Sequence, residues 1–566
     1  MLEIIISWIY IGLVCILLGT GLLEVANRIT GKEANGRKPV FSMIDAVMAG
    51  ILGITVYVEI WSLFGRIQML AQLVLLAGCM GGAFLGRKKL QELAKQSKKI
   101  LFSWEGFFYL CFVVFLAFFA SRGEFHTDTN IYHAQAIRMY EEYGVLKGSG
   151  NLQQHYGYNS AGLAFASIFS FNWLLGHSVH STTGFLEVVM CIYAFHGLKT
   201  FSQHRRHTAD MMRIAILFYA LIILVRTMSP ATDYATMFLV LYVLTAWCEN
   251  MEGEKSITRY SLLSVFAVLV MTYKFSACML VLLAIYPAFY LIKGRKWKQI
   301  GLYVISGMVI LLPFLLRNYL ISGWLLYPFG GIDLFHPVWK VPKEYLTVDS
   351  RQITVWGRCL YDITQIDKPM KEWLPVWWSE KERYEQMFLG AQVLGIILLG
   401  AQFVMRRIRK EKWRGDFAAF LLAIFANLVV WFRMAPFIRY GQVFLLAVPL
   451  IAAGEWLDDR KKGFYSILCG SLVFGLVITV SAYWEPYITY AGVFVKQNYT
   501  SPYYVWQQEY DRGEVDSLEI NGNTVYYNSG SEEINSYYYF PNTCYPHMLE
   551  RSTLIGNTIE EGFQAK

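Results

Sequence analysis

The stretch Trp104-Glu-Gly-Phe-Phe-Tyr-Leu-Cys-Phe-Val-Val-Phe-Leu-Ala-Phe-Phe-Ala120 contains one charged residue, Glu105. A helix needs about 20 mostly apolar residues to cross a bilayer, and its backbone polar groups must then be bonded within the segment. Of the 566 residues, 55% are hydrophobic and 16% are charged, which is less charge than a soluble surface needs. We therefore expect an all-α polytopic membrane protein, with further spans at Ile4–Val25, Met211–Met228, Gly301–Leu316 and Phe388–Val404.

The basic residues are concentrated in short connections between apolar blocks. Such loops stay in the cytoplasm under the positive-inside rule. The net charge of +8 therefore reflects membrane topology, and we expect the lipid bilayer, not a nucleic acid, as a partner. The rule predicts about 14 spanning helices, with both termini outside. Seven connections carry 28 of the 50 Lys and Arg residues, near residues 25–40, 87–100, 199–210, 249–260, 293–299, 406–414 and 457–463.

The same topology divides the chain into three parts. Residues 1–103 hold three spanning helices that precede the core. The core covers 104–485 and has large outer loops at 122–158 and 319–386. The last part, 486–566, is expected to form a small outer domain.

Two segments need a local interpretation. Residues 159–175 are apolar, but counting them as a span would move the basic connection near 199–210 to the outside, so we expect a re-entrant or interfacial helix. In the C-terminal part, Asn521-Gly522 is a strong turn signal between alternating apolar positions. It predicts a β-hairpin over Leu518–Tyr527.

The first outer loop begins with a dense group of polar side chains. It reads Glu124-Phe-His-Thr-Asp-Thr-Asn-Ile-Tyr-His-Ala-Gln-Ala-Ile-Arg138 and directly follows a span. One interpretation is that Asp128 caps a helix that starts near Asn130, since a carboxylate satisfies free backbone N–H groups. The density of polar groups favours a functional site instead, made of His126, Asp128, Asn130, His133 and Arg138.

This loop resembles the GT-C glycosyltransferases, polytopic membrane enzymes that include protein O-mannosyltransferases and aminoarabinose transferases. In that family a first helix leads into a large outer loop with an acidic motif, to which His126-Thr-Asp-Thr-Asn-Ile-Tyr-His133 is similar. This sequence has a single carboxylate, Asp128, in place of the commoner Asp-Glu or Asp-x-Asp forms. A lone Asp with two His is a poor magnesium or manganese site, so we expect no metal and no cofactor.

Further short matches extend the resemblance over most of the chain after residue 104, and a bacterial branch of glycosyltransferase-like membrane proteins is the most similar. As a set they imply a GT-C-like bundle in a bacterial cytoplasmic membrane and a reaction class, but no particular substrate. The matching stretches are Tyr140-Glu-Glu-Tyr-Gly-Val, Gly150-Asn-Leu, Tyr158-Asn-Ser, Ser229-Pro-Ala-Thr-Asp-Tyr234, Thr272-Tyr-Lys-Phe-Ser276, Arg317-Asn-Tyr-Leu-Ile-Ser-Gly, Leu326-Tyr-Pro-Phe, Ile332-Asp-Leu-Phe, Trp339-Lys-Val-Pro342 and Glu561-Gly-Phe.

The resemblance also implies a mechanism. Asp128 is the base that takes the proton from an acceptor hydroxyl as it attacks the anomeric carbon of the sugar, with inversion. The donor is a sugar on a polyprenyl phosphate, and the acceptor is a glycan or polymer of the cell envelope. The leaving phosphate needs a cation more than a proton donor.

Four basic residues at the outer ends of expected helices are candidates for binding this phosphate: Lys274, Arg317, Arg433 and Arg439. Arginine binds phosphate oxygens in a bidentate manner, although basic residues at helix ends also reach the interface simply by snorkelling. Asp233 lies at an outer turn, where it either helps to bind the sugar or caps the following helix.

Three other functions stay open. A transporter or flippase of lipid-linked saccharides would place ionisable residues near mid-membrane, whereas the helix middles here are nearly free of charge. A polysaccharide polymerase or ligase shares the outer site and the lipid phosphate, and the sequence separates it poorly from a monosaccharide transferase. A sensor would need a cytoplasmic output domain, for which the sequence offers no candidate. We therefore expect an outward-facing glycosyltransferase.

Overall fold

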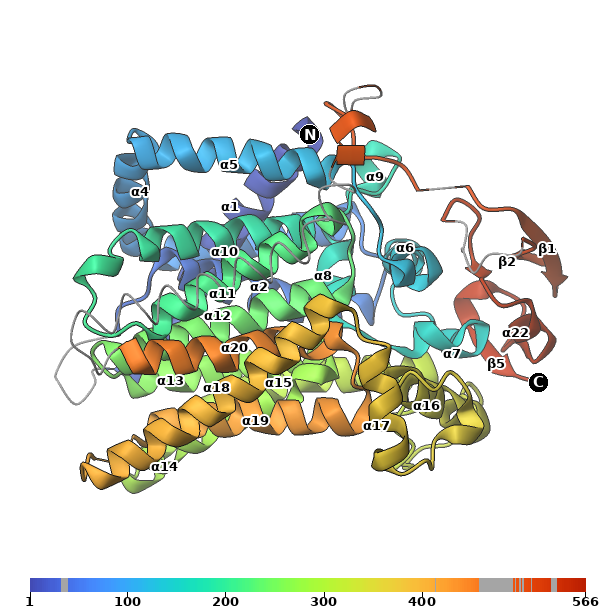
Figure 1. The fold of residues 1–566 in the computed structure, drawn as a ribbon. Coiled ribbons are helices and arrows are strands. Elements are labelled where there is room, and N and C mark those ends of the chain that lie inside the picture. The colour runs from blue at the N-terminus through green and yellow to red at the C-terminus, as the bar shows by residue number, and fades with distance from the viewer. Residues whose placement is uncertain are drawn as a thin grey trace.

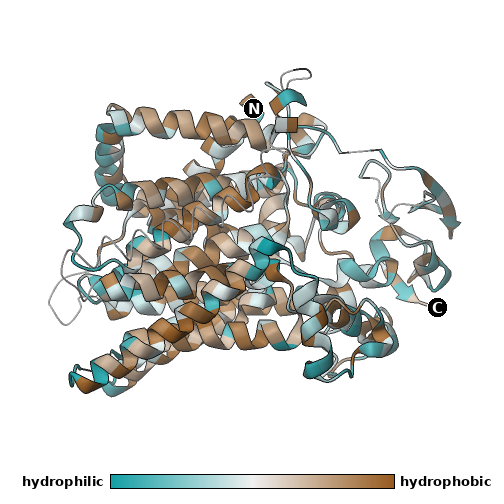
Figure 2. Ribbon diagram, viewed as in Figure 1, coloured by the Kyte–Doolittle hydropathy of each residue, from teal (hydrophilic) through white to brown (hydrophobic). Residues whose placement is uncertain are grey.

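Long helices run side by side in a bundle, and shorter helices and strands cover one end of it (Figure 1). The computed structural model describes residues 1–31, 39–412, 414–457, 492–493, 495–497, 500, 503–510, 512–530 and 537–566. Hydrophobic residues extend along the bundle helices, and hydrophilic residues gather towards the two ends (Figure 2). This distribution is typical of helices that lie in lipid.

Nine helices in the described part are long and apolar enough to cross a membrane, and a bent pair would make a tenth. The chain is therefore a mostly helical, multi-pass membrane protein. The nine are α1 (Leu2–Thr30), α2 (Met43–Ser62), α5 (Trp104–Ser121), α11 with η4 (Thr208–Arg226), η5 with α14 (Phe275–Lys293), α15 (Trp297–Ser322), α18 (Arg383–Ile408), α19 (Gly415–Met434) and α20 (Ile438–Leu457).

The expected number of about 14 spans is larger than this count. Helices α10 (Thr182–Leu198) and α13 (Ile257–Tyr273) are apolar but have only 17 residues each. Helix α12 (Thr232–Glu252) is longer and less apolar. The span expected after residue 463 lies outside the described residues. An apolar block in the sequence therefore does not always become a helix of spanning length.

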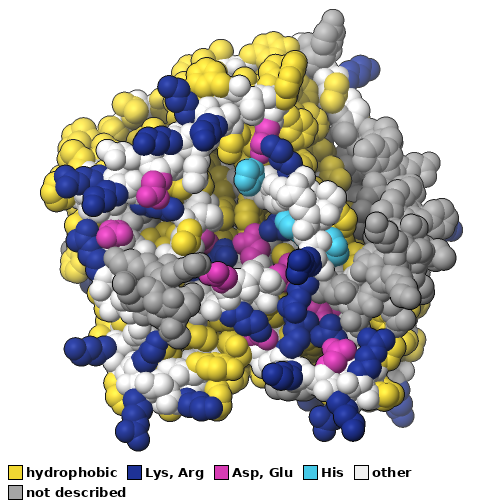
Figure 3. All heavy atoms as spheres, turned by 90° about the vertical axis from the view of Figure 1, so that its left-hand side faces the viewer, with side chains coloured by type: hydrophobic (Ala, Val, Ile, Leu, Met, Phe, Trp, Pro, Cys, Tyr) yellow, Lys and Arg dark blue, Asp and Glu magenta, His cyan; other side chains and the backbone are white. Residues whose placement is uncertain are grey.

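The bent pair marks one end of the bundle. Residues 87–100, expected to be a connection, form the basic helix α4 (Arg87–Leu101), which lies at 89° to α3 (Met69–Leu85). A basic amphipathic helix of this kind is typical of a membrane surface. Lys and Arg side chains are spread over this end of the molecule (Figure 3). The positive-inside rule predicts that this end faces the cytoplasm.

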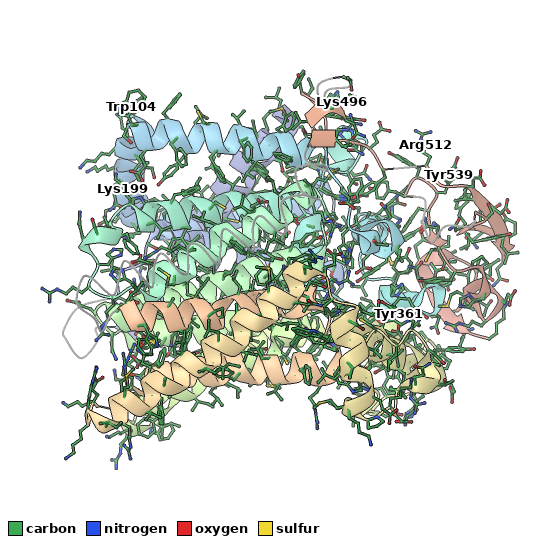
Figure 4. All side chains as sticks on the ribbon, in the orientation of Figure 1. Trp104, Lys199, Tyr361, Lys496, Arg512 and Tyr539 are labelled. Carbon is green, nitrogen blue, oxygen red and sulfur yellow. The ribbon has the colours of Figure 1, made fainter. Side chains whose placement is uncertain are left out.

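The opposite end carries the two long segments expected outside. Figure 4 shows Tyr361 and Tyr539 at this end, and Trp104 and Lys199 at the α4 end. Segment 122–158 forms η1 (Thr129–His133), α6 (Ala134–Glu142), α7 (Ser149–Leu152) and η2 (Gln154–Gly157), and segment 319–386 forms α16 (Lys343–Gly357), η6 (Ile363–Gln365) and α17 (Met370–Ser379).

Residues 159–175 form two short helices, α8 (Ala161–Ser167) and α9 (Asn172–Leu175). Neither is long enough to cross a bilayer, since a span needs about 20 residues. This agrees with the re-entrant or interfacial arrangement expected from the sequence.

The C-terminal region contains strands, so the all-α fold class is correct only for the helical bundle. The hairpin expected over Leu518–Tyr527 is confirmed: β1 (Val515–Ile520) pairs antiparallel with β2 (Asn523–Asn528) across Asn521-Gly522. Both turn residues have positive φ, 51° and 77°, as a two-residue hairpin loop requires. Strand β3 (Asn542–Thr543) joins β2 in the same sheet. A short helix, α22 (Pro546–Glu550), follows, and β4 (Ser552–Leu554) pairs with β5 (Phe563–Ala565) in a second sheet.

The first helices pack closely on one another and on the rest of the bundle. A Cβ added to Gly19 of α1 would lie 1.9 Å from the carbonyl oxygen of Ala46, and one added to Gly50 of α2 would lie 2.1 Å from that of Cys15. Glycines allow membrane helices to approach this closely. Helix α2 also contacts α8 and α15. The domain boundary at residue 103 stays a prediction.

Candidate active site

A cavity of about 360 Å³ is lined by both outer segments and by the ends of several bundle helices. Its polar lining includes Asp128, Lys274 and Arg439, three of the residues singled out from the sequence. These come from the segment after α5, the junction of α13 and η5, and the first turn of α20. The fold thus brings together side chains that are more than 300 positions apart in the chain.

Asp128 stands immediately before η1, in the position of a helix cap. Its side chain makes no capping hydrogen bond. The turn is held by other groups: the Thr129 N–H donates to the His126 carbonyl oxygen at 2.8 Å, and the Thr129 and Ser229 hydroxyls are 2.6 Å apart. The carboxylate of Asp128 is therefore available for another role.

Arg439 is the centre of the polar cluster. Its guanidinium donates from NH2 to Asp128 Oδ2 at 3.2 Å and lies 2.5 Å from His126 Nε2 through NH1. Its Nε is 3.9 Å from Asp233 Oδ2. The Asp128 N–H also donates to His126 Nδ1 at 3.1 Å. Because a neutral imidazole has one acceptor nitrogen and both partners are donors, only one of the two contacts to His126 can be a hydrogen bond at a time.

A second ion pair lies beside the first. Lys274 Nζ donates to Asp233 Oδ1, and the same ammonium lies 4.0 Å from the ring centroid of Tyr440. Asp233 is 1% exposed and stands in the first turn of α12, whose N-cap Ala231 has no side-chain cap. Its carboxylate holds Lys274 and does not cap the helix.

The charges in this cluster balance. Burial lowers the pKa of His126 to about 4 and that of His133 to about 3, so both rings are neutral near pH 7. Burial by itself raises the pKa of Asp128, but the Arg439 guanidinium, with a smaller contribution from Lys274, brings it below its usual range. Two carboxylates, Asp128 and Asp233, therefore face two cations, Arg439 and Lys274.

The same residues include a possible metal-binding group. His126, Asp128 and Asp233 each place one ligand atom within 4.8 Å of the others. Oxygen and nitrogen ligands at this spacing suit several divalent ions. However, Arg439 already contacts all three side chains. An ion here would have to displace the guanidinium, and the expectation of no metal stays a prediction.

Three of the other candidate residues do not line the cavity. Arg138 donates from NH1 to the Tyr537 carbonyl oxygen at 2.6 Å and from Nε to Glu142 at 2.5 Å, so it holds the C-terminal region. Arg433 is exposed at the end of α19. Asn130 is half-buried in η1 and does not line the cavity.

The last candidate cation, Arg317, is fully buried. Its side chain is 0% exposed and NH1 lies 3.6 Å from Glu59 Oε1, which is also 0% exposed. Its guanidinium lies 4.6 Å from the ring centroid of Tyr140. Arg317 does not line the cavity, so it has no access to a phosphate there.

Several lining residues were not identified as candidates. Tyr158 and Tyr327 fall in stretches that carry the family resemblance, and Tyr132 lies inside the acidic motif itself. The position of these aromatic residues inside the stretches that carry the resemblance is the signal that marks them as candidate ligand contacts. Asp349 gives no signal in the sequence, because one Asp in the polar helix α16 looks like an ordinary surface residue.

The family described as Domain of unknown function (DUF8201) matches residues 1–446. The matched range includes Asp128, Lys274, Arg439 and all other lining residues of the cavity except Tyr545. No curated protein and no solved structure matches the chain. The resemblance to GT-C glycosyltransferases therefore stays a prediction. The chain is a multi-pass helical membrane protein that belongs to the DUF8201 family.

Proposed function

We propose that the chain is a glycosyltransferase that moves a sugar from a polyprenyl-phosphate donor to an acceptor hydroxyl on the outer side of the membrane. The observation that carries the proposal is the state of Asp128. It lines a cavity, makes no capping bond, and lies beside two cations, Arg439 and Lys274. A base next to cations is the combination that sugar transfer from a phosphate requires.

In the proposed reaction Asp128 takes the proton of the acceptor O–H. The acceptor oxygen forms a bond to the anomeric carbon of the donor sugar. The bond from that carbon to the phosphate oxygen breaks, and its electron pair leaves with the polyprenyl phosphate. Attack from the side opposite the leaving group inverts the anomeric configuration. The phosphate gains one negative charge, which Arg439 and Lys274 stabilise.

Donor binding also makes Asp128 a stronger base. Arg439 keeps the pKa of Asp128 below its usual range against the effect of burial, which raises it. A donor phosphate competes for the same guanidinium, since arginine binds phosphate oxygens in a bidentate manner. As Arg439 turns towards the phosphate, the pKa of Asp128 rises and proton transfer from the acceptor becomes more favourable.

The apolar part of the cavity suits a lipid-linked donor. Phe275, Phe314, Val430 and Met434 line it. They belong to η5, α15 and α19, which are candidate membrane spans. A polyprenyl chain can therefore lie in the bilayer or against these helices while its phosphate reaches Lys274 and Arg439.

The test is a transfer assay with the purified chain in nanodiscs, undecaprenyl-phosphate sugars as donors and envelope extract as acceptor. We expect the wild type to consume one donor and Asp128→Asn to be slower by about 10²–10⁴-fold with unchanged thermal stability. Asp516→Asn, at an exposed site on β1, is the matched control. Full activity of Asp128→Asn would show that the base lies elsewhere. Movement of a lipid-linked saccharide without donor consumption would instead support a flippase, and chain elongation a polymerase.

A further inference from the structure

The cavity has a second carboxylate, Asp349, for which the proposed reaction has no use. Asp349 lies on α16, lines the cavity and is 2% exposed. The Tyr158 hydroxyl donates to its Oδ2 at 2.5 Å and the Tyr327 hydroxyl donates to the same oxygen at 3.2 Å. Three separate segments of the chain thus meet at one carboxylate on the cavity wall.

A row of aromatic rings extends along the cavity wall from this carboxylate to Tyr132 in η1, the helix that Asp128 precedes. Tyr132 stacks on His155 with ring centroids 5.2 Å apart and planes at 23°. His155 lies 5.7 Å from Tyr158, which lies 5.5 Å from Tyr327. All four rings line the cavity. An aromatic face offers an apolar surface to the C–H face of a pyranose ring, while nearby polar groups bind its hydroxyls.

We call the part of the cavity wall with Arg439 and Lys274 the Arg439 end and the part with Asp349, Tyr158 and Tyr327 the Asp349 end; the two parts differ in charge. The two cations at the Arg439 end attract a phosphate. At the Asp349 end the charged group that lines the cavity is Asp349, and its partners there are phenol hydroxyls. The charge of Arg551 also acts on Asp349 and lowers its pKa. The Arg551 guanidinium itself lies 3.7 Å from the ring centroid of Tyr345. A neutral ligand rich in hydroxyls suits the Asp349 end, whereas a phosphate suits the Arg439 end.

We propose that the Asp349 end of the cavity binds the acceptor, and that this acceptor is a saccharide whose hydroxyls bond to Asp349 while its ring lies against Tyr132, His155 and Tyr158. The role of this saccharide as acceptor rests on the proposed glycosyltransferase function. The donor phosphate is thereby assigned to Arg439 and Lys274 and the acceptor sugar to the Asp349 end. The reacting hydroxyl of that sugar then has to reach Asp128, which lies beside Arg439.

The ionisation of Asp349 gives this site a pH dependence. Burial raises the pKa of Asp349 to about 6, against the effect of its hydrogen bonds from Tyr158 and Tyr327 and the charge of Arg551. Above that pH the carboxylate is ionised and accepts strong hydrogen bonds from sugar hydroxyls. Burial lowers the pKa of His155 to about 4, so this ring does not titrate in the same range. Saccharide binding is therefore expected to strengthen as pH rises through about 6.

Saturation-transfer NMR tests the site without any need for catalysis. The full chain in nanodiscs is titrated with methyl glycosides of glucose, galactose, mannose, rhamnose and N-acetylglucosamine. We expect at least one glycoside to bind, with an affinity about tenfold or more weaker in Asp349→Asn and unchanged in Asp516→Asn. Wild-type binding that strengthens with pH through about 6 supports the proposal even if the Asp349 variant does not fold.

Two controls separate this site from the proposed reaction. Undecaprenyl phosphate should leave the glycoside signal in place, and displacement of the glycoside would overturn the assignment of the two ends. In transfer assays with the bound glycoside as acceptor, Asp349→Asn should raise the acceptor KM about tenfold and leave the donor KM unchanged.

The outcomes distinguish the two proposals. If no glycoside binds, or if Asp349→Asn has the wild-type acceptor KM, the Asp349 site is wrong while measured transfer still supports the glycosyltransferase. If a glycoside binds through Asp349 but no donor is consumed, the saccharide site is supported and the glycosyltransferase is wrong.

Discussion

Arg317 and Arg439 have the same position in the sequence pattern but very different surroundings. Each lies near the end of a long apolar helix, α15 or α20, and each was a candidate for binding phosphate. The side chain of Arg439 is 36% exposed, lines the cavity and contacts Asp128 and His126. The side chain of Arg317 is 0% exposed and is paired with the equally buried Glu59.

The two arginines differ in whether a ligand can reach the guanidinium. Arg439 can exchange its carboxylate partner for a ligand, because the cavity is open to it. Arg317 cannot do so, because it is fully buried between Glu59, 3.6 Å away, and the ring of Tyr140. A buried pair of this kind matters mainly because loss of one partner leaves an uncompensated charge. We infer that Arg439 serves binding and Arg317 serves the packing of α2 on α15.

The largest expected effect is therefore on stability and comes from the buried pair. Arg317→Leu leaves Glu59 without its cation and should lower the free energy of unfolding by about 3–5 kcal/mol. The measurement is thermal unfolding of the purified chain in nanodiscs. The double variant Glu59→Leu/Arg317→Leu removes both charges and should recover much of the loss. Wild-type stability of Arg317→Leu would contradict the presence of an uncompensated buried charge at Glu59.

A smaller effect, on activity only, is expected at Arg439. Arg439→Lys keeps the charge but loses the planar fork that binds phosphate in a bidentate manner. We expect the transfer rate to fall by about tenfold or more, with the donor KM raised and thermal stability within error of the wild type. The matched control is Arg433→Lys, because Arg433 lies exposed at the end of α19 and outside the cavity. Equal losses in both variants would contradict a special role for Arg439.

The features of the fold that depend on local sequence were predictable. Apolar blocks such as Trp104–Ala120 became helices, and Asn521-Gly522 became the hairpin turn. The number of spans was less predictable, because the length of a helix depends on where its neighbours end. α10 and α13 are apolar but stop at 17 residues. The strands after residue 514 other than the hairpin are too short to give a periodic signal.

The candidate site was predictable only in part. Asp128, Lys274 and Arg439 were identified from their positions beside membrane helices, and the structure places all three on one cavity. The same pattern could not exclude Arg317, because a position at a helix end does not show which neighbours surround it. Asp349 became visible only through its contacts with Tyr158 and Tyr327, which come from distant parts of the chain.

The smallest effect is expected from removal of divalent ions. This removal tests whether Arg439, unlike the buried Arg317, is the cation that is available to a ligand. His126, Asp128 and Asp233 are close enough to hold an ion, but Arg439 and Lys274 already neutralise the two carboxylates. A metal would therefore have to replace a cation that the proposed reaction uses for the phosphate. We expect EDTA to change the transfer rate by less than about twofold.

A loss of activity with EDTA that Mg²⁺ or Mn²⁺ restores would contradict this expectation. His126→Gln distinguishes the two cases further, because it removes the imidazole ligand while Asp128 and Arg439 remain. If Arg439 and Lys274 are the only cations at the site, EDTA should change the transfer rate of His126→Gln as little as it changes that of the wild type. If a metal is bound, the variant should need a higher ion concentration, and Arg439 would then be displaced from Asp128 when the ion is present.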